Sequence, residues 1–331
     1  MNSQIYEKEG SMTYRTKALT TVFSSGCVLC IALAIILLLP ASSWAHGFAG
    51  ERFFPTTFQV DDPFISDEFS ILINRVKQPG DEPNMLTQID IDYSKRILPN
   101  FGLEFHEAYV HLGSNGDGSA NGWDNLGIGA KWQFLTNAPH ELILSVGTDF
   151  DLGGTGAHQI ADSFTTISPA LFFGKGLGDL PESVKYLRPF AITGVIGPNF
   201  PTRSKNVLVD PDTGETDIER NPTTLTWAFT LQYSLIYLQS FVKDIGLGAP
   251  FKRMILVTEF PMETCMSADC KGKITGTVNP GVVWCGKYME FGVAAQIPIN
   301  SRSGHSVGIL GLLHLYVDDL WPKGIGGPIF H

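Results

Sequence analysis

The chain has 331 residues, a formal net charge of −10, 35 glycines and 11% aromatic residues. Its 44% apolar content excludes a chain that is disordered throughout, and its 17% charged residues fall below the roughly 25% of an average soluble domain. An acidic chain without a run of Lys and Arg also argues against a nucleic-acid partner, because binding would require neutralisation of the phosphates.

The first 45 residues have the features of a cleavable signal peptide. Arg15 and Lys17 precede an almost wholly apolar run over residues 22–39. Small residues at both ends of 43–45 fit the rule for a cleavage site, which predicts a mature start at His46 and export from the cytoplasm. The alternative is an uncleaved inner-membrane anchor, although 18 residues are barely enough to span a bilayer.

The segment 46–68 is rich in prolines and acids that break any strand pattern. We expect it to be a periplasmic lead-in that covers or plugs the mouth of the following domain. No apolar run approaching 18 residues follows position 39, so a membrane-embedded mature chain has to be a closed β-barrel.

Residues 69–331 alternate between apolar and polar side chains, which indicates β-strands. The alternation is clearest from Leu225 to Tyr237, where only Ile236 breaks it. Most of the stretches have about 10–13 residues, which suits a strand that crosses a bilayer at a tilt. The twelve predicted strands cover 69–77, 86–96, 101–112, 123–135, 140–152, 163–174, 187–197, 223–238, 251–261, 274–286, 288–298 and 306–317.

Tight or structured links follow the even-numbered predicted strands, and polar loops follow the odd-numbered ones. This pattern is typical of bacterial outer-membrane barrels, which have short periplasmic turns and longer outer loops. The predicted fold is therefore all-β, a single antiparallel up-and-down transmembrane β-barrel of about twelve strands over residues 69–331.

Four stretches of the mature chain carry a family resemblance: Gly47–Pro55 (GFAGERFFP), Asp61–Phe64 (DDPF), Tyr237–Asp244 (YLQSFVKD) and His314–Pro322 (HLYVDDLWP). With these stretches, the chain resembles secreted barrel proteins of Gram-negative bacteria. It looks most like the outer-membrane transporters grouped with the MetA-pathway-of-phenol-degradation proteins. The resemblance implies a place in the lipid of the outer membrane, insertion by the barrel-assembly machinery and small-molecule solutes as partners.

The polar faces of the strands predict the lining of the lumen. Seven acids and two bases are placed there, which predicts an acidic lumen that prefers cations or neutral solutes, because charges that line a pore select by sign. The alternative is that several of these acids pair with the bases or sit at strand ends. The lumen-facing candidates are Asp90, Asp92, Glu104, His106, Lys131, Asp149, Asp151, Arg253, Glu259, Glu290 and His314.

No motif points to catalysis, and we expect no catalytic residue, cofactor or metal. His106, Glu107 and His111 are spaced HExxxH, one residue too long for a zinc-protease helix, and they fall in a predicted strand. His314 is expected to be a structural histidine of the lumen, because no signature places a serine beside it. We therefore expect the protein not to be an enzyme.

The mature chain has three cysteines. Cys265 and Cys270 lie in one predicted loop and are expected to form a disulfide in an oxidising compartment. Cys285 lies in a strand, where it is either free or a competitor for one of the other two.

The predicted function is that of a passive channel or uptake porin for small molecules, hydrophobic ones included. The alternative from another class is a structural or adhesion barrel whose lumen is closed by side chains and residues 46–68. An outer-membrane hydrolase is disfavoured because the sequence has no nucleophile motif.

Overall fold

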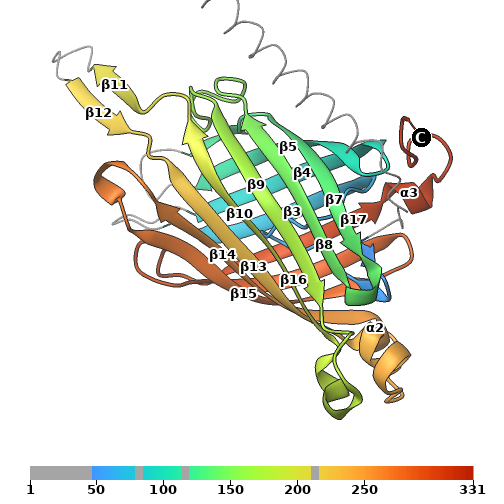
Figure 1. Ribbon diagram of the computed structural model, residues 1–331. Helices are drawn as coiled ribbons and strands as arrows, with labels where there is room; N and C mark the ends of the chain where they lie inside the picture. Colours follow the sequence, from blue (N-terminus) through green and yellow to red (C-terminus); the bar gives the residue numbers. More distant parts are fainter. Residues whose placement is uncertain (1–46, 79–84, 114–118, 210–215, 331) are drawn as a thin grey trace, which may run out of the picture. The chain divides into compact units, whose positions relative to one another are not determined.

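The computed structural model describes residues 47–78, 85–113, 119–209 and 216–330, and within them twelve long strands form one antiparallel barrel (Figure 1). A short strand, β6 (Ala120–Trp123), continues the line of β7 along the edge of β5. The barrel strands are β3 (Glu68–Lys77), β4 (Met85–Leu98), β5 (Phe101–Gly113), β7 (Gly127–Asn137), β8 (Leu142–Asp151), β9 (Thr166–Gly176), β10 (Phe190–Pro201), β13 (Thr224–Ser234), β14 (Met254–Cys265), β15 (Ile274–Cys285), β16 (Met289–Pro298) and β17 (Gly308–Tyr316).

The barrel is closed because its last strand pairs with its first. β17 runs antiparallel to β3 with His314 opposite Ser70, and every other barrel strand pairs with its neighbours in the chain. Closure leaves the barrel without an unpaired edge. The prediction of an all-β, up-and-down barrel of about twelve strands is confirmed.

The two ends of the barrel carry different structures (Figure 1). A hairpin of β11 (Lys205–Val209) and β12 (Thr216–Arg220) extends one end, between β10 and β13. The other end carries the chain's short helices α2 (Leu235–Tyr237) and α3 (Val317–Leu320), and a π-helical turn over Leu238–Val242. We call this second end the inner mouth. No helix of the described residues is long and apolar enough to cross a membrane.

Several predicted strand limits are wrong where a helical turn replaces the strand end. The predicted strand 223–238 stops at Ser234, whose hydroxyl accepts a hydrogen bond from the backbone N–H of Tyr237 and caps α2. The predicted strand 187–197 begins only at Phe190, after a 3₁₀ segment over Glu182–Leu187. Further 3₁₀ turns cover Ala138–His140, Phe251–Arg253 and Ala268–Cys270.

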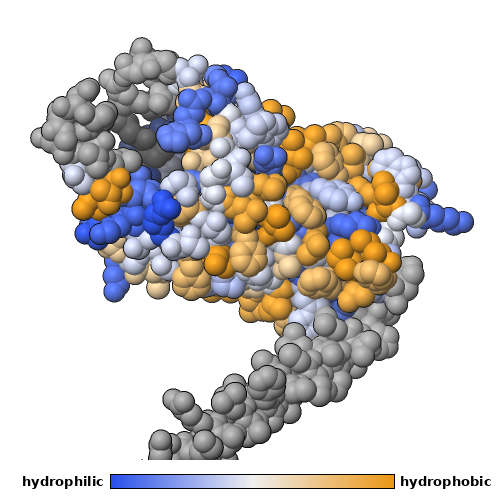
Figure 2. Space-filling view, turned by 90° about the horizontal axis from the view of Figure 1, so that it is seen from above, coloured by the Kyte–Doolittle hydropathy of each residue, from blue (hydrophilic) through white to orange (hydrophobic). Residues whose placement is uncertain are grey.

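The outer surface of the barrel is apolar, as the alternation predicts. On β13, Leu231 is 44% exposed, whereas its neighbours Thr230 and Gln232 are buried inside. Orange apolar side chains spread over the side of the barrel in Figure 2. Large exposed side chains on other strands include Ile73, Phe105, Val146, Leu171, Ile196, Leu256, Phe291 and Ile309.

Residues 54–67, which precede β3, lie inside the barrel; we call them the lumen segment. Phe58 packs against interior side chains of β3 and β14 to β17, and Phe54 and Phe64 pack near Ile143 on β8. Interior glycines make room for this segment: a Cβ atom on Gly292 would lie 2.8 Å from the Phe58 ring. Before the lumen segment, β1 (Phe48–Ala49) and β2 (Arg52–Phe53) form a small hairpin at the inner mouth.

Candidate functional site

A buried carboxylate on the barrel wall holds the middle of the lumen segment. Glu259, fully buried on β14, accepts hydrogen bonds from the backbone N–H of Phe58 (2.6 Å) and of Gln59 (3.1 Å). The side chain of Gln59 in turn accepts hydrogen bonds from Asn279 and Gln296. A carboxylate that accepts backbone N–H groups is a strong, charge-assisted anchor.

A second anchor lies at the acidic part of the lumen segment. Lys131, only 2% exposed on β7, lies 3.0 Å from the carboxylate of Asp61 and 2.9 Å from that of Glu104 on β5. Its ammonium also donates to the backbone carbonyl of Asp62. The ammonium of Lys131 thus binds both the lumen segment and the barrel wall.

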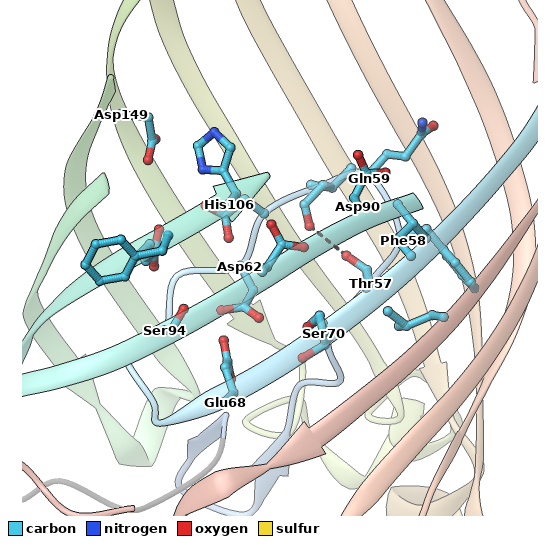
Figure 3. A pocket seen from close by; sticks show the side chains of 18 of the residues that line it. Thr57, Phe58, Gln59, Asp62, Glu68, Ser70, Asp90, Ser94, His106 and Asp149 are labelled. Carbon is cyan, nitrogen blue, oxygen red and sulfur yellow. Dashed lines mark hydrogen bonds between the residues drawn. The ribbon is translucent and has the colours of Figure 1, made fainter. Parts of the chain in front are cut away.

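A cavity of about 420 Å³ lies between the lumen segment and the wall of β3, β4, β5 and β8; we call it the lumen cavity. Figure 3 shows carboxylates from the segment and from separate strands pointing into it. Among the described residues that line it there is no Lys or Arg. The acidic side chains that face it are Asp61, Asp62, Glu68, Asp90, Asp92, Glu104 and Asp149.

The structure brings part of the predicted lumen set together in this cavity. Asp90 and Asp92 point inward from β4, opposite Leu72 and Ser70 of β3. His106 lines the same space, and its Nε2 lies 3.0 Å from Asp151 on β8. No three His, Cys, Asp or Glu side chains of the described residues are arranged to hold a metal ion.

Other predicted lumen residues are sealed inside instead of facing open space. Glu259 is consumed as an anchor, and the fully buried Glu290 accepts a hydrogen bond from the hydroxyl of Tyr316. His314, 1% exposed, has its Nδ1 2.8 Å from Ser70 Oγ and its Nε2 3.3 Å from Thr56 Oγ1. A serine therefore does lie beside His314, although both side chains are almost completely buried.

Arg253 is misplaced by the prediction. It belongs to the 3₁₀ turn Phe251–Arg253 before β14, so it is exposed at the inner mouth and not part of a wall strand. Its guanidinium donates hydrogen bonds to the backbone carbonyls of Cys285 and Gly286. It therefore fixes the turn between β15 and β16.

A buried ion pair holds the small hairpin at the inner mouth. Arg52 is 1% exposed, lies 3.2 Å from Glu141, donates to the carbonyl of Pro189 and stacks 3.8 Å from the ring centre of Tyr237. Burial and, after it, the Glu141 carboxylate raise the pKa of Tyr237 above its ordinary value, so the phenol stays neutral. Burial lowers the pKa of Arg52, and the Glu141 carboxylate opposes this shift.

A second ion cluster ties the C-terminal tail to the barrel. Asp67 pairs with Lys95 (2.5 Å) and Arg96 (2.6 Å) of β4, and Arg96 also lies 3.4 Å from Asp318 of α3. Backbone N–H groups of residues 329 and 330 donate to carbonyls at the end of β4. The tail thus packs along the inner end of β4.

The disulfide of the structure joins Cys265 and Cys270, with 5.7 Å between their Cα atoms. It lies between β14 and β15, at the end opposite the inner mouth. Cys285 is a free, buried thiol.

Sequence reasoning missed the partners that the lumen segment contributes. Asp61 and Asp62 carry the only available signal, a pair of acids in a segment without strand pattern. The alternation of the strands does not predict that Lys131, Glu259 and Gln296 contact the lumen segment. These contacts join residues that lie 70 to 237 positions apart in the chain.

The chain matches no protein-family model and no curated protein. Among solved structures it is similar to the KdgM porin (14% identity, 74% of this chain and 98% of that chain, TM-score 0.42). It is also similar to an outer membrane channel from Pseudomonas putida F1 (10% identity, 80% and 99%, TM-score 0.48). A third is the translocator domain of the autotransporter NalP from Neisseria meningitidis (8% identity, 77% and 88%, TM-score 0.44).

These structural neighbours are outer-membrane barrel proteins of differing function, and every score lies below 0.5. The function of this barrel therefore has to be inferred from its own residues. The resemblance to the MetA-pathway group stays a prediction.

Proposed function

We propose that the protein is a passive outer-membrane channel for small cationic or neutral solutes, with the lumen segment setting its narrowest point. The observation that carries this proposal is the lumen cavity, into which carboxylates of the segment and of four strands point. Low-dielectric walls focus the field of such carboxylates onto a passing ion.

The apolar outer surface of the barrel supports a location in a membrane. A closed barrel satisfies its backbone hydrogen bonds internally, and an outward band of large apolar side chains suits lipid. The export signal over residues 1–45 lies outside the described residues. With it, the proposal includes cleavage before His46 and a place in the outer membrane. Mass analysis of the protein from outer-membrane fractions should give His46 as its first residue, and an intact N-terminus in the inner-membrane fraction would contradict this.

The experiment that tests conduction is the reversal potential of the purified protein in planar bilayers under a KCl gradient. We expect cation preference in the native protein and a weaker preference in Asp90→Asn/Asp92→Asn, because these carboxylates line the lumen cavity. The matched control is Asp269→Asn, since Asp269 belongs to the loop between β14 and β15 and does not line the cavity. Anion preference, or equal selectivity in all three proteins, would overturn the proposal.

A structural barrel with a closed lumen is the second candidate. The anchors from Glu259 and Lys131 favour it, because they fasten the lumen segment across the interior. The absence of conductance and of liposome swelling, both in the native protein and in a variant with a loosened segment, would favour this candidate over the channel.

A further inference from the structure

The inner mouth holds a second cavity, of about 820 Å³, whose chemistry differs from that of the lumen cavity; we call it the inner pocket. Its volume lies in the range of pockets that enclose small-molecule ligands, roughly 300–1,000 Å³. It is lined by the small hairpin, the helical turn after β13, and the ends of β15 and β17. Its main apolar walls are Phe48, Phe53, Ile236, Tyr237, Phe241 and Tyr316.

The walls are preformed by contacts among these rings. The rings of Phe48 and Phe53 lie 5.1 Å apart, those of Tyr237 and Phe241 4.9 Å apart, and Phe53 meets Tyr316 edge-on at 6.5 Å. Arg52 stacks on Tyr237 and is itself fixed by Glu141, so this wall is held in place from behind. A ligand would enter a pocket that needs little ordering, which favours affinity.

The charges at the pocket decide the class of ligand. Two acids, Glu51 and Asp319, and two bases, Arg253 and Lys287, are part of its lining. The formal charges cancel, in contrast to the lumen cavity, whose lining holds acids without Lys or Arg among the described residues. A balanced rim around aromatic walls offers no net attraction to an ion and favours a neutral molecule.

We propose that the inner pocket is a binding site for an uncharged aromatic small molecule. Phe241 and Phe48 are 46% and 36% exposed, so a flat apolar ligand would remove ring surface from water and gain edge-to-face contacts. The charged rim leaves room for one polar group on the ligand. This site does not depend on whether the barrel conducts.

The test uses three photoreactive probes that share one ring system: benzophenone, 4-benzoylbenzoate and (4-benzoylbenzyl)trimethylammonium. The protein purified from membranes is placed in lipid nanodiscs, irradiated with each probe and mapped by peptide mass spectrometry. We expect saturable crosslinks of benzophenone to the peptides around Phe48, Phe53 and Phe241, with weaker crosslinks from both charged probes.

Two variants separate the pocket from the bilayer. Phe241→Ala removes a wall ring and should weaken the crosslinking about three- to tenfold, as expected for one aromatic contact. Phe251→Ala is the matched control, because Phe251 is more exposed (56%) and lies in the neighbouring turn but does not line the pocket. Equal loss in both variants, or unsaturable crosslinks spread over the barrel strands, would overturn the proposal by showing partition into lipid.

Stronger crosslinking by 4-benzoylbenzoate would equally overturn it, because Arg253 and Lys287 would then define an anion site. A failed conductance experiment leaves the benzophenone result unchanged, so the two experiments test the channel and the inner pocket independently.

Discussion

The carboxylate of Glu259 lies 2.6 Å from the backbone nitrogen of Phe58, a residue 201 positions away in the chain. A single side chain of the barrel wall thereby binds the backbone of the lumen segment. The hydrogen bond joins backbone to carboxylate, so it depends on the path of the segment and not on the identity of residue 58.

Replacing Glu259 by Leu should loosen the lumen segment. The N–H groups of Phe58 and Gln59 would lose their acceptor inside the barrel, and an unsatisfied buried donor costs about 1–3 kcal/mol. We expect faster proteolytic cleavage within residues 46–67 and a larger conductance. Glu263→Leu is the control, since Glu263 also points inward from β14 but binds Thr224. Equal cleavage rates in native protein and E259L would contradict the anchoring role.

Replacing Arg52 by Ala should destabilise the inner mouth. Glu141, 4% exposed, would remain as a buried carboxylate without its main partner, and breaking a buried ion pair costs about 3–5 kcal/mol. Urea titration of the barrel should show this loss, and Arg52→Lys should recover only part of it because the stacking on Tyr237 is lost. Lys185→Ala removes an exposed partner of Glu182 and should leave the midpoint unchanged. A variant R52A as stable as the native protein would refute this prediction.

A charged side chain on the outward face of β13 should lower the stability of the barrel in lipid. Leu231 is 44% exposed on the apolar outer surface, so Leu231→Arg should lower the free energy of unfolding in lipid by about 2–4 kcal/mol. Leu231→Ala should cost less, because it removes contact area without adding a charge. Folding titrations into vesicles would measure both, and a larger cost for Ala than for Arg would show that this position does not face lipid.

The cysteines should differ in their reactivity. Iodoacetamide should leave the native protein unmodified over residues 46–331, because Cys265 and Cys270 are joined and Cys285 is 2% exposed. Reduction without unfolding should add two alkyl groups, and reduction in denaturant should add three. Two groups on the unreduced native protein, read from the intact mass, would show that the loop disulfide does not form.

The sequence by itself determined the barrel. A strand has a side-chain period of two, so lipid outside and protein inside impose an alternation. It is clearest in the letters from Leu225 to Ser234 and recurs, less regularly, in the other eleven predicted strands. The link lengths then give the up-and-down order. The sequence predicted the strand ends less well where a helix cap such as Ser234 or a 3₁₀ turn such as Phe251–Arg253 replaces the hydrogen bonds between strands.

Only the tertiary structure decided what fills the lumen. Residues 54–67 have no periodicity, because each of their partners comes from a different strand: Lys131 from β7, Glu259 from β14, and His314 from β17. The alternation assigns those side chains to the interior. It does not distinguish a carboxylate that lines the lumen cavity, such as Asp92, from a buried one that binds the lumen segment, such as Glu259. Facing is a local property of a strand, whereas pairing inside a closed barrel depends on how residues far apart in the chain meet across it.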